Sequence, residues 1–266
     1  MTRTLLPAAS LARREVVRFL RQRNRVVSAL LQPALFWALF GAGFSRAFAA
    51  APGGDAAAPQ DFLRFLFPGT VVLVVLFTAI FATFSVLEDR AAGFLQSVLA
   101  APVSRTGIVL GKVAGGTAIA LVHGALFLLL ALAPGVDVPL SLPTALAALG
   151  ALALVGVALG SLGLAVAWPM ESVQGFHAVM MLFLLPMWLL SGAFFSFEGS
   201  APWLGAVMHA NPLSYGVALV RHALDPDGAA RSGGPGPAAS LAVAAGFAAV
   251  TFLAALFVVG RRGRRD

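Results

Sequence analysis

Long apolar runs that contain almost no charged residue constrain this chain more than any other feature. About 20 consecutive apolar residues in a helix are needed to cross the roughly 30 Å hydrocarbon core of a bilayer. Six runs approach or exceed that length: residues 26–44, 65–87, 108–132, 144–168, 176–195 and 240–259. Only 11% of all residues are charged and 59% are hydrophobic, whereas a soluble domain has about 25% charged residues. The sequence therefore predicts an all-α membrane protein with six transmembrane helices, which make up a single domain over residues 26–259.

The distribution of basic residues predicts how these spans are oriented. Residues 1–25 hold seven Arg, and a basic tail at residues 260–266 holds four more. The segments on the same side of the membrane also contain Arg90, Arg105 and Lys112, whereas the loops on the other side contain Arg46, Arg64, Arg221 and Arg231. Cytoplasmic loops carry an excess of Lys and Arg, so both termini are expected in the cytoplasm.

The same distribution weighs against two other interpretations. The net charge of +7 comes from residues beside apolar runs, which is typical of juxtamembrane segments, and no nucleic-acid partner is expected. Ala47-Phe48-Ala49 resembles a signal-peptide cleavage site, but the basic lead and the apolar run before it are both long for a signal peptide.

Residues 1–25 have the pattern of an amphipathic helix in the cytoplasmic interface. One face carries Arg14, Arg18, Arg21 and Arg25, and another carries Ala12, Val16, Phe19 and Leu20. Ser10 is a candidate N-cap. A disordered basic leader is the alternative.

The segment between the second and third spans predicts a short cytoplasmic helix of about ten to twelve residues. Phe94, Leu95, Val98 and Leu99 form an apolar stripe at helical spacing. Glu88 and Asp89 are expected at the helix start, where acidic groups complement the dipole, and Pro102 is expected to close it. So short a helix must pack on something. The residues alone leave two surfaces equally open, the membrane surface and a groove on a soluble partner.

The start of the third span has its own signals. Ser104 or Thr106 is expected to cap it, and Lys112 is expected to extend back toward the cytoplasmic interface. Gly111 and Gly115, like Gly156 and Gly160 in the next span, are spaced for close packing between helices. Pro33 and Pro186 lie inside spans and are expected to kink them.

Residues 196–239 are too long for a turn and too apolar for an ordinary loop. The sequence predicts two short helices there, with Asn211 as an N-cap, Pro212 at the first helical position, and Arg221 and His222 in the last turn. Helices this short lie at the outer interface or enter the bilayer and return. Residues 225–239 are expected to be a flexible linker.

Two stretches resemble a known family. "EDRAAGFLQSVLAAPVSRTGIVLGK" is similar to the central motif of the type-2 ABC exporter permeases, with its acidic-and-Arg start, Gly, apolar helix, Pro-Val-Ser-Arg and Leu-Gly-Lys. "LLSGAFFSFEGSAPWLGAVMHANPLSYGVALVRHAL" is similar to that family's second motif, although Ser196 follows the aromatic pair where the family usually has Pro. Both stretches occur in the family's order on a six-span chain.

The resemblance implies a permease in a bacterial cytoplasmic membrane that works with two copies of an ABC ATPase subunit and with a second permease, identical or different. Its cargo would be hydrophobic, amphipathic or glycan-type. The residues implied in coupling to the ATPase are Glu88, Asp89, Arg90, Gly93, Phe94, Leu95, Val98, Leu99, Pro102 and Arg105. The residues implied in the outer re-entrant region are Trp203, Asn211, Pro212, Tyr215 and Arg221.

Other functions find less support in the sequence. The chain has no G-x-x-x-x-G-K-[ST] loop, so ATP and Mg²⁺ are expected only in the partner ATPase, with no cofactor in this chain. An ion-coupled secondary transporter is the alternative, but no Asp or Glu falls within the six predicted spans, where only His123 and His177 are well placed to be buried. The chain has no Cys and no H-E-x-x-H or G-x-S-x-G motif, so no catalytic or metal site is predicted.

Overall fold

The computed structural model describes residues 2–49, 59–133, 136, 138–198 and 200–262, and all regular structure in these residues is helical. The first half contains α1 (Thr2–Arg21), α2 (Arg23–Ala49), α3 (Pro59–Ala82), α4 (Phe84–Ala91), α5 (Phe94–Ala100) and α6 (Arg105–Leu128), which continues as the 3₁₀ helix η1 (Leu129–Leu132). The second half contains α7 (Leu142–Ala167), α8 (Val173–Trp188), the π-helical turn η2 (Leu189–Ala193), α9 (Pro202–Ala210), α10 (Pro212–Leu224), α11 (Pro226–Arg231) and α12 (Pro237–Arg262).

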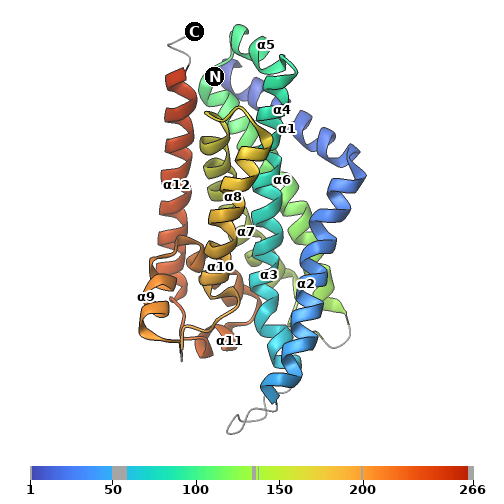
Figure 1. Cartoon of the computed structure of the whole chain (residues 1–266), viewed down its shortest axis with the longest axis vertical. Helices are drawn as coiled ribbons and strands as arrows, with labels where there is room; N and C mark the ends of the chain where they lie inside the picture. Colours follow the sequence, from blue (N-terminus) through green and yellow to red (C-terminus); the bar gives the residue numbers. More distant parts are fainter. Residues whose placement is uncertain (1, 50–58, 134–135, 137, 199, 263–266) are drawn as a thin grey trace.

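The long helices run side by side along the long axis of the molecule (Figure 1). α5 lies at the same end as α1 and the last turn of α12, whereas α9 and α11 lie in the opposite half. α3 is the central helix, and every residue from Leu66 to Ile80 is buried by α2, α6, α7 and α10. A core helix that is apolar all round is what the uninterrupted run after Phe65 predicts.

Five helical stretches are long and apolar enough to cross a membrane: residues 62–91, 105–132, 142–167, 173–193 and 237–261. They correspond to the second to sixth predicted spans. The first predicted span, residues 26–44, lies on α2, whose apolar described part, Val26–Gly41, is shorter. Several predicted boundaries move: the second span bends at Thr83 into α3 and α4, and the fifth ends in the π-helical turn just after Pro186.

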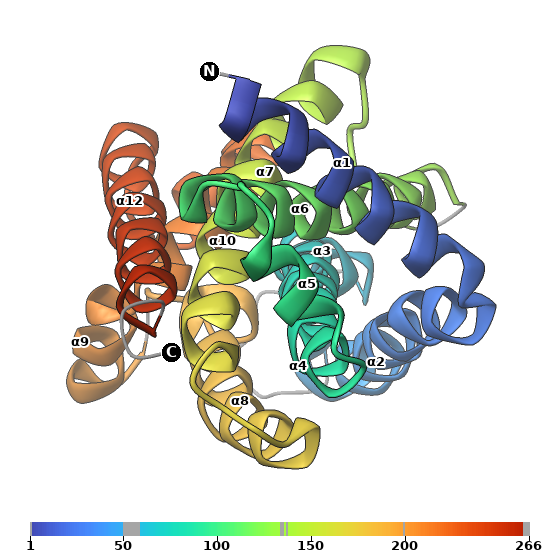
Figure 2. The same cartoon turned by 90° about the horizontal axis from the view of Figure 1, so that it is seen from above.

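The N-terminal residues form a helix, as predicted, but its start and its buried face differ. α1 begins at Thr2, so Ser10 lies in mid-helix and is not an N-cap. The buried residues of α1 are Ala8, Leu11, Glu15 and Phe19. Leu20, expected on the apolar face, is exposed. The reason is packing: α1 lies across the bundle against α6 (Figure 2), and this contact selects the face.

The linker predicted at residues 225–239 is partly helical. Asp225 caps α11 by accepting a hydrogen bond from the Gly228 amide at 3.2 Å, and α12 begins at Pro237. Of the loop after the first span, residues 50–58 lie outside the described residues, as do residues 263–266 of the basic tail.

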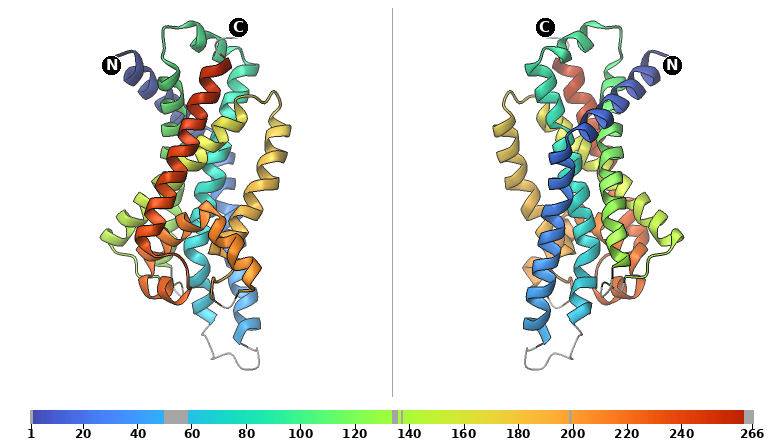
Figure 3. Two further views of the ribbon diagram at one scale, coloured as in Figure 1. Left: turned by 90° about the vertical axis from the view of Figure 1, so that its left-hand side faces the viewer. Right: turned by 90° about the vertical axis from the view of Figure 1, so that its right-hand side faces the viewer.

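α8 lies along the outside of the bundle (Figure 3). Its His177 is exposed, contrary to the expectation that this side chain is buried.

Candidate functional site

The candidate site is the junction at which α1, α4, α5 and α6 meet. α6 begins at the predicted cap, because the Ser104 hydroxyl accepts a hydrogen bond from the Gly107 amide at 3.0 Å. Gly111 and Gly115 on this helix face α1. A Cβ atom at Gly111 would lie 2.8 Å from the carbonyl oxygen of Ala8, and one at Gly115 would lie 2.9 Å from the Cβ of Glu15. Glycine therefore permits the two backbones to approach closely, as in membrane helix pairs.

The close approach of α1 places Glu15 beside Lys112 of α6. The Lys112 ammonium donates hydrogen bonds to Glu15 Oε1 at 2.6 Å, to Asp89 Oδ2 at 2.6 Å and to Ser85 Oγ at 3.1 Å. These use all three ammonium donors. The exposed fractions are 8% for Lys112, 4% for Glu15 and 2% for Asp89. The Lys112 ammonium, expected to extend back toward the cytoplasmic interface, is instead buried between two carboxylates.

Two arginines of α1 complete the cluster. Arg14 donates to both oxygens of Asp89, at 2.8 and 3.0 Å, and Arg18 donates to Asp89 at 2.9 Å and to Glu88. Hydrogen bonding to Asp89 raises the pKa of Arg14 above its ordinary value, so this group stays charged. Three cations thus face three carboxylates, and the buried charges are paired, as burial in a low dielectric requires. We call these six residues the junction cluster: Arg14, Glu15, Arg18, Glu88, Asp89 and Lys112.

The short helix after the cluster differs from its prediction in two ways. Glu88 and Asp89 are not at its start but in α4, because Gly93 adopts a left-handed conformation with φ of 74° that separates α4 from α5. Such a conformation favours glycine. The helix ends at Ala100 just before Pro102, as expected.

The second difference is the surface against which the apolar side chains of α5 pack. Leu95 is buried, and Phe94, Val98 and Leu99 pack around the same cluster of apolar side chains, which includes Leu11, Val86, Ile108, Val113 and Trp168. The stripe therefore packs within this chain. The exposed residues of α5 and of the two positions that follow it are Gln96, Ser97, Ala100, Ala101 and Pro102.

Further contacts hold α5 and α4 to their neighbours. The Arg14 guanidinium lies 3.7 Å from the centre of the Phe94 ring, a cation–π contact. Arg90 donates hydrogen bonds to the carbonyl oxygens of Trp168 and Met170, just after α7. Arg105 is the first residue of α6. The junction therefore connects α1, α4, α5, α6 and the end of α7.

Of the residues predicted for the outer region, Asn211 and Arg221 both bind backbone groups at the end of α8 and in the π-helical turn η2 that follows it. Asn211 caps α10 as predicted, accepting from the Leu213 amide at 3.0 Å, and its amide donates to the carbonyl oxygens of Met187 and Leu190. Arg221, 4% exposed, donates to the carbonyl oxygen of Gly192 at 2.8 Å. These bonds satisfy backbone groups that the π-helical turn leaves without partners.

The other predicted outer residues have different environments. Pro212 is the first residue of α10, as expected. The Tyr215 hydroxyl donates to the carbonyl oxygen of His209 at 2.9 Å, and Trp203 is 68% exposed. Asp225 pairs with Arg64 at 2.6 Å, which connects α10 and α11 to the start of α3.

Sequence reasoning did not find the roles of Glu15, Ser85 and Lys112. One signal was present: Glu15 is the single acidic residue among the first 54. An acidic group isolated on a basic helix is a candidate for a buried ion pair. No spacing rule, however, identifies its partner 97 residues away.

Comparison with known proteins gives a consistent result. Residues 8–224 match the family described as "ABC-2 type transporter". The chain is 27% identical over 214 residues to the "Putative transport permease ycf38" of Porphyra purpurea, which covers 80% of this chain and 72% of that protein. It is 30% identical over 167 residues to "Nodulation protein J" of Sinorhizobium fredii, which covers 61% of this chain and 62% of that protein.

Proposed function

Because the chain belongs to the ABC-2 type transporter family, a family of multi-pass transport permeases and not of enzymes, we propose that it is the membrane subunit of an ATP-driven exporter. Permeases of this family generally work with an ABC ATPase subunit. We propose two ATPase subunits, which bind ATP and Mg²⁺, and a second permease subunit beside this one. The cargo is hydrophobic, amphipathic or glycan-type.

We propose that α5 and the junction cluster transmit movement from the ATPase to the spans. The observation that carries this proposal is the burial of Asp89, which accepts hydrogen bonds from α1 and α6 while its own helix leads directly into α5. A force applied to α5 therefore reaches α1, α4 and α6 through charge-assisted hydrogen bonds, which are stronger than neutral ones. The ATPase would contact the exposed face of α5, since the apolar stripe is used within the chain.

The topology in this proposal has six spans, with α2 as the first. The excess of Arg at residues 1–25 and near the C-terminus supports a cytoplasmic location for both termini and for α5 in a bacterial inner membrane. α1 then lies in the cytoplasmic interface, and α9 and α10 lie at the outer side. Residues 26–259 form the permease domain.

Single-cysteine cross-linking tests the proposal, and the chain contains no Cys that would give a background. Ser97→Cys places a thiol on the exposed face of α5, and Ala230→Cys places one on α11, exposed in the opposite half. The permease is co-expressed with ABC ATPase subunits from the same organism, each tested in turn. We expect a cross-link to the ATPase from Ser97→Cys alone.

The same two variants test the topology. In intact cells, a membrane-impermeant maleimide is expected to label Ala230→Cys and not Ser97→Cys. Cross-linking of the ATPase to Ala230→Cys, or labelling of Ser97→Cys from outside, would overturn the proposal.

A further inference from the structure

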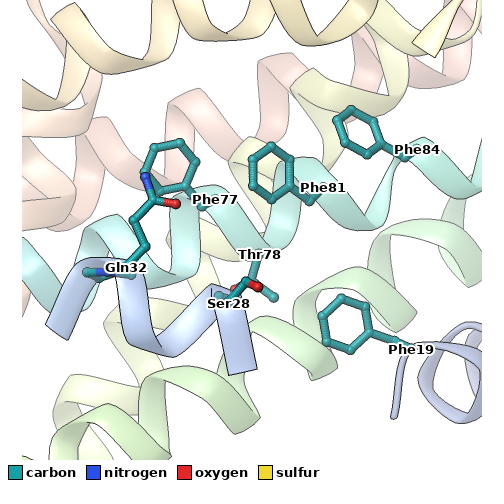
Figure 4. Close-up of a pocket in the computed structure, with 9 residues that line it drawn as sticks. Phe19, Ser28, Gln32, Phe77, Thr78, Phe81 and Phe84 are labelled. Carbon is teal, nitrogen blue, oxygen red and sulfur yellow. The ribbon is translucent and has the colours of Figure 1, made fainter. Parts of the chain in front are cut away.

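A cavity of about 280 Å³ lies between α2 and the α3–α4 pair, on the core side of the junction. Figure 4 shows the rings of Phe77, Phe81 and Phe84 in a row along α3 and α4, opposite α2, with Phe19 of α1 beside them. The volume is close to the lower end of the range of small-molecule pockets, roughly 300–1,000 Å³.

The wall on the α3–α4 side is a ladder of aromatic rings. The centres of the Phe77 and Phe81 rings are 5.5 Å apart, and those of Phe81 and Phe84 are 5.2 Å apart, with interplanar angles near 30°. His177 of α8 stacks on Phe81 at 5.8 Å. Ring centres at 4.5–7 Å are the spacing of favourable aromatic pairs, so a flat ring entering the cavity can extend this ladder.

Among the described residues that line the cavity, the polar groups are few and uncharged. Ser28 and Gln32, one helical turn apart, are the two hydroxyl or amide residues of the apolar run 26–44, and both line this cavity. Thr78 lines it from α3, and its hydroxyl lies 3.1 Å from Nδ1 of the buried His123. Polar side chains on a membrane helix normally face protein or a cavity because lipid offers them no hydrogen bonds.

We propose that this cavity binds a neutral aromatic molecule that carries a hydroxyl or carbonyl group. The phenyl walls contact the ring system, and the Gln32 amide, which both donates and accepts, pairs with the polar group. A charged ligand is disfavoured, because none of the side chains described as lining the cavity is charged and could compensate its charge. The site lies within one chain and requires no ATPase, so its test is independent of the proposed function.

Photolabelling of the purified chain in lipid nanodiscs tests the site, with 4-hydroxybenzophenone as the probe. This molecule is neutral and aromatic, has both a hydroxyl and a carbonyl group, and inserts into nearby C–H bonds on irradiation. We expect saturable labelling, mapped by mass spectrometry to residues 28–29, 32–33 and 77–84 and displaced by 4-phenylphenol.

Two matched variants separate the cavity from the lipid-facing surface. Ala29→Phe fills the cavity and is expected to reduce saturable labelling at least tenfold, whereas Ala38→Phe, on the exposed side of the same helix, is expected to leave it unchanged. Gln32→Leu removes the polar partner and is expected to weaken binding roughly fivefold, the effect of one hydrogen bond. This variant decides the question if Ala29→Phe fails to fold.

Three results would overturn the proposal. The first is labelling that does not saturate or that maps to the exposed face of Leu31, Leu35 and Leu39. The second is unchanged labelling in both Ala29→Phe and Gln32→Leu. The third is displacement by 1-decanol as strong as by 4-phenylphenol, because an acyl chain would then be the occupant.

Discussion

Lys112 of α6 and Asp89 of α4 form a buried ion pair, with Nζ 2.6 Å from Oδ2. Asp89 also binds Arg14 and Arg18, and Lys112 also binds Glu15. The helix that leads into α5 is therefore held on both sides, by α1 and by α6. Buried charged contacts therefore join α4 to both α1 and α6.

Removing the ammonium group should destabilise the fold. Lys112→Met leaves Glu15 and Asp89 buried with one cation fewer, and breaking a buried pair in this way costs about 3–5 kcal/mol. We expect that loss in the free energy of unfolding, measured by denaturant titration in detergent. The double variant Lys112→Met/Glu15→Gln should recover at least half of it, because the most poorly compensated charge is then removed. A Lys112→Met variant as stable as the parent would show that the pair contributes little.

Replacing a glycine by alanine should lower stability in α6 and raise it in α7. Gly111→Ala places a methyl group 2.8 Å from the Ala8 carbonyl oxygen, and overpacking of this kind costs about 1–3 kcal/mol. Gly160→Ala in α7 meets nothing within 4 Å and should stabilise the helix by about 0.5–1 kcal/mol. Thermal unfolding of the two variants checks this, and equal effects would contradict the packing of α1 on α6.

Substitutions on the two faces of α5 should separate folding from partner binding. Leu95→Glu buries a carboxylate among apolar side chains and is expected to prevent folding or to lower stability by several kcal/mol. Ser97→Glu is on the exposed face, so stability should change by less than about 0.5 kcal/mol while ATPase binding and ATP-dependent transport fall. Size-exclusion chromatography, ATPase co-purification and transport into vesicles measure these effects. Normal folding of Leu95→Glu would mean that the stripe is free for a partner.

Asn211 should matter more for stability than the exposed Trp203 of α9. Asn211→Ala removes the cap of α10 and two hydrogen bonds, one to a carbonyl oxygen of α8 and one to a carbonyl oxygen of η2. We expect a cost of about 2–3 kcal/mol in the free energy of unfolding. Trp203→Ala should leave stability within about 0.5 kcal/mol. Asn211→Asp keeps the cap acceptor and loses the donors, so it should fall between the two in thermal unfolding. If Asn211→Ala is as stable as Trp203→Ala, the bonds to α8 are not structural.

Structural features that depend only on residues close together in the chain could be predicted from the sequence. The positions of the apolar helices follow from the length of apolar runs, and the caps at Ser104 and Asn211 follow from the short reach of a side chain to its own backbone. The end of α5 before Pro102 follows from the ring of proline. His123 is buried, as expected, and its Nδ1 lies 3.1 Å from the Thr78 hydroxyl of α3, since lipid offers it no partner.

Contacts between distant segments were decided only by the tertiary structure. Lys112 was expected at the interface because a lone lysine near a span end normally reaches water. It is buried because Glu15 and Asp89, 97 and 23 residues away, meet there. Gly111 packs closely and Gly160 does not, although each belongs to a G-x-x-x-G pair: a Cβ at Gly111 would lie 2.8 Å from the Ala8 carbonyl oxygen of α1, whereas one at Gly160 would meet nothing within 4 Å.

The sequence alone thus determined that this chain forms apolar helices, where most of them lie and how several are capped, because apolar length and local hydrogen bonding are encoded in adjacent residues. The tertiary structure decided that the stripe of α5 faces its own chain and that the junction cluster holds α1 to α4 and α6. Both depend on which helix faces lie opposite each other, and a helical pattern specifies a face but not the surface that covers it.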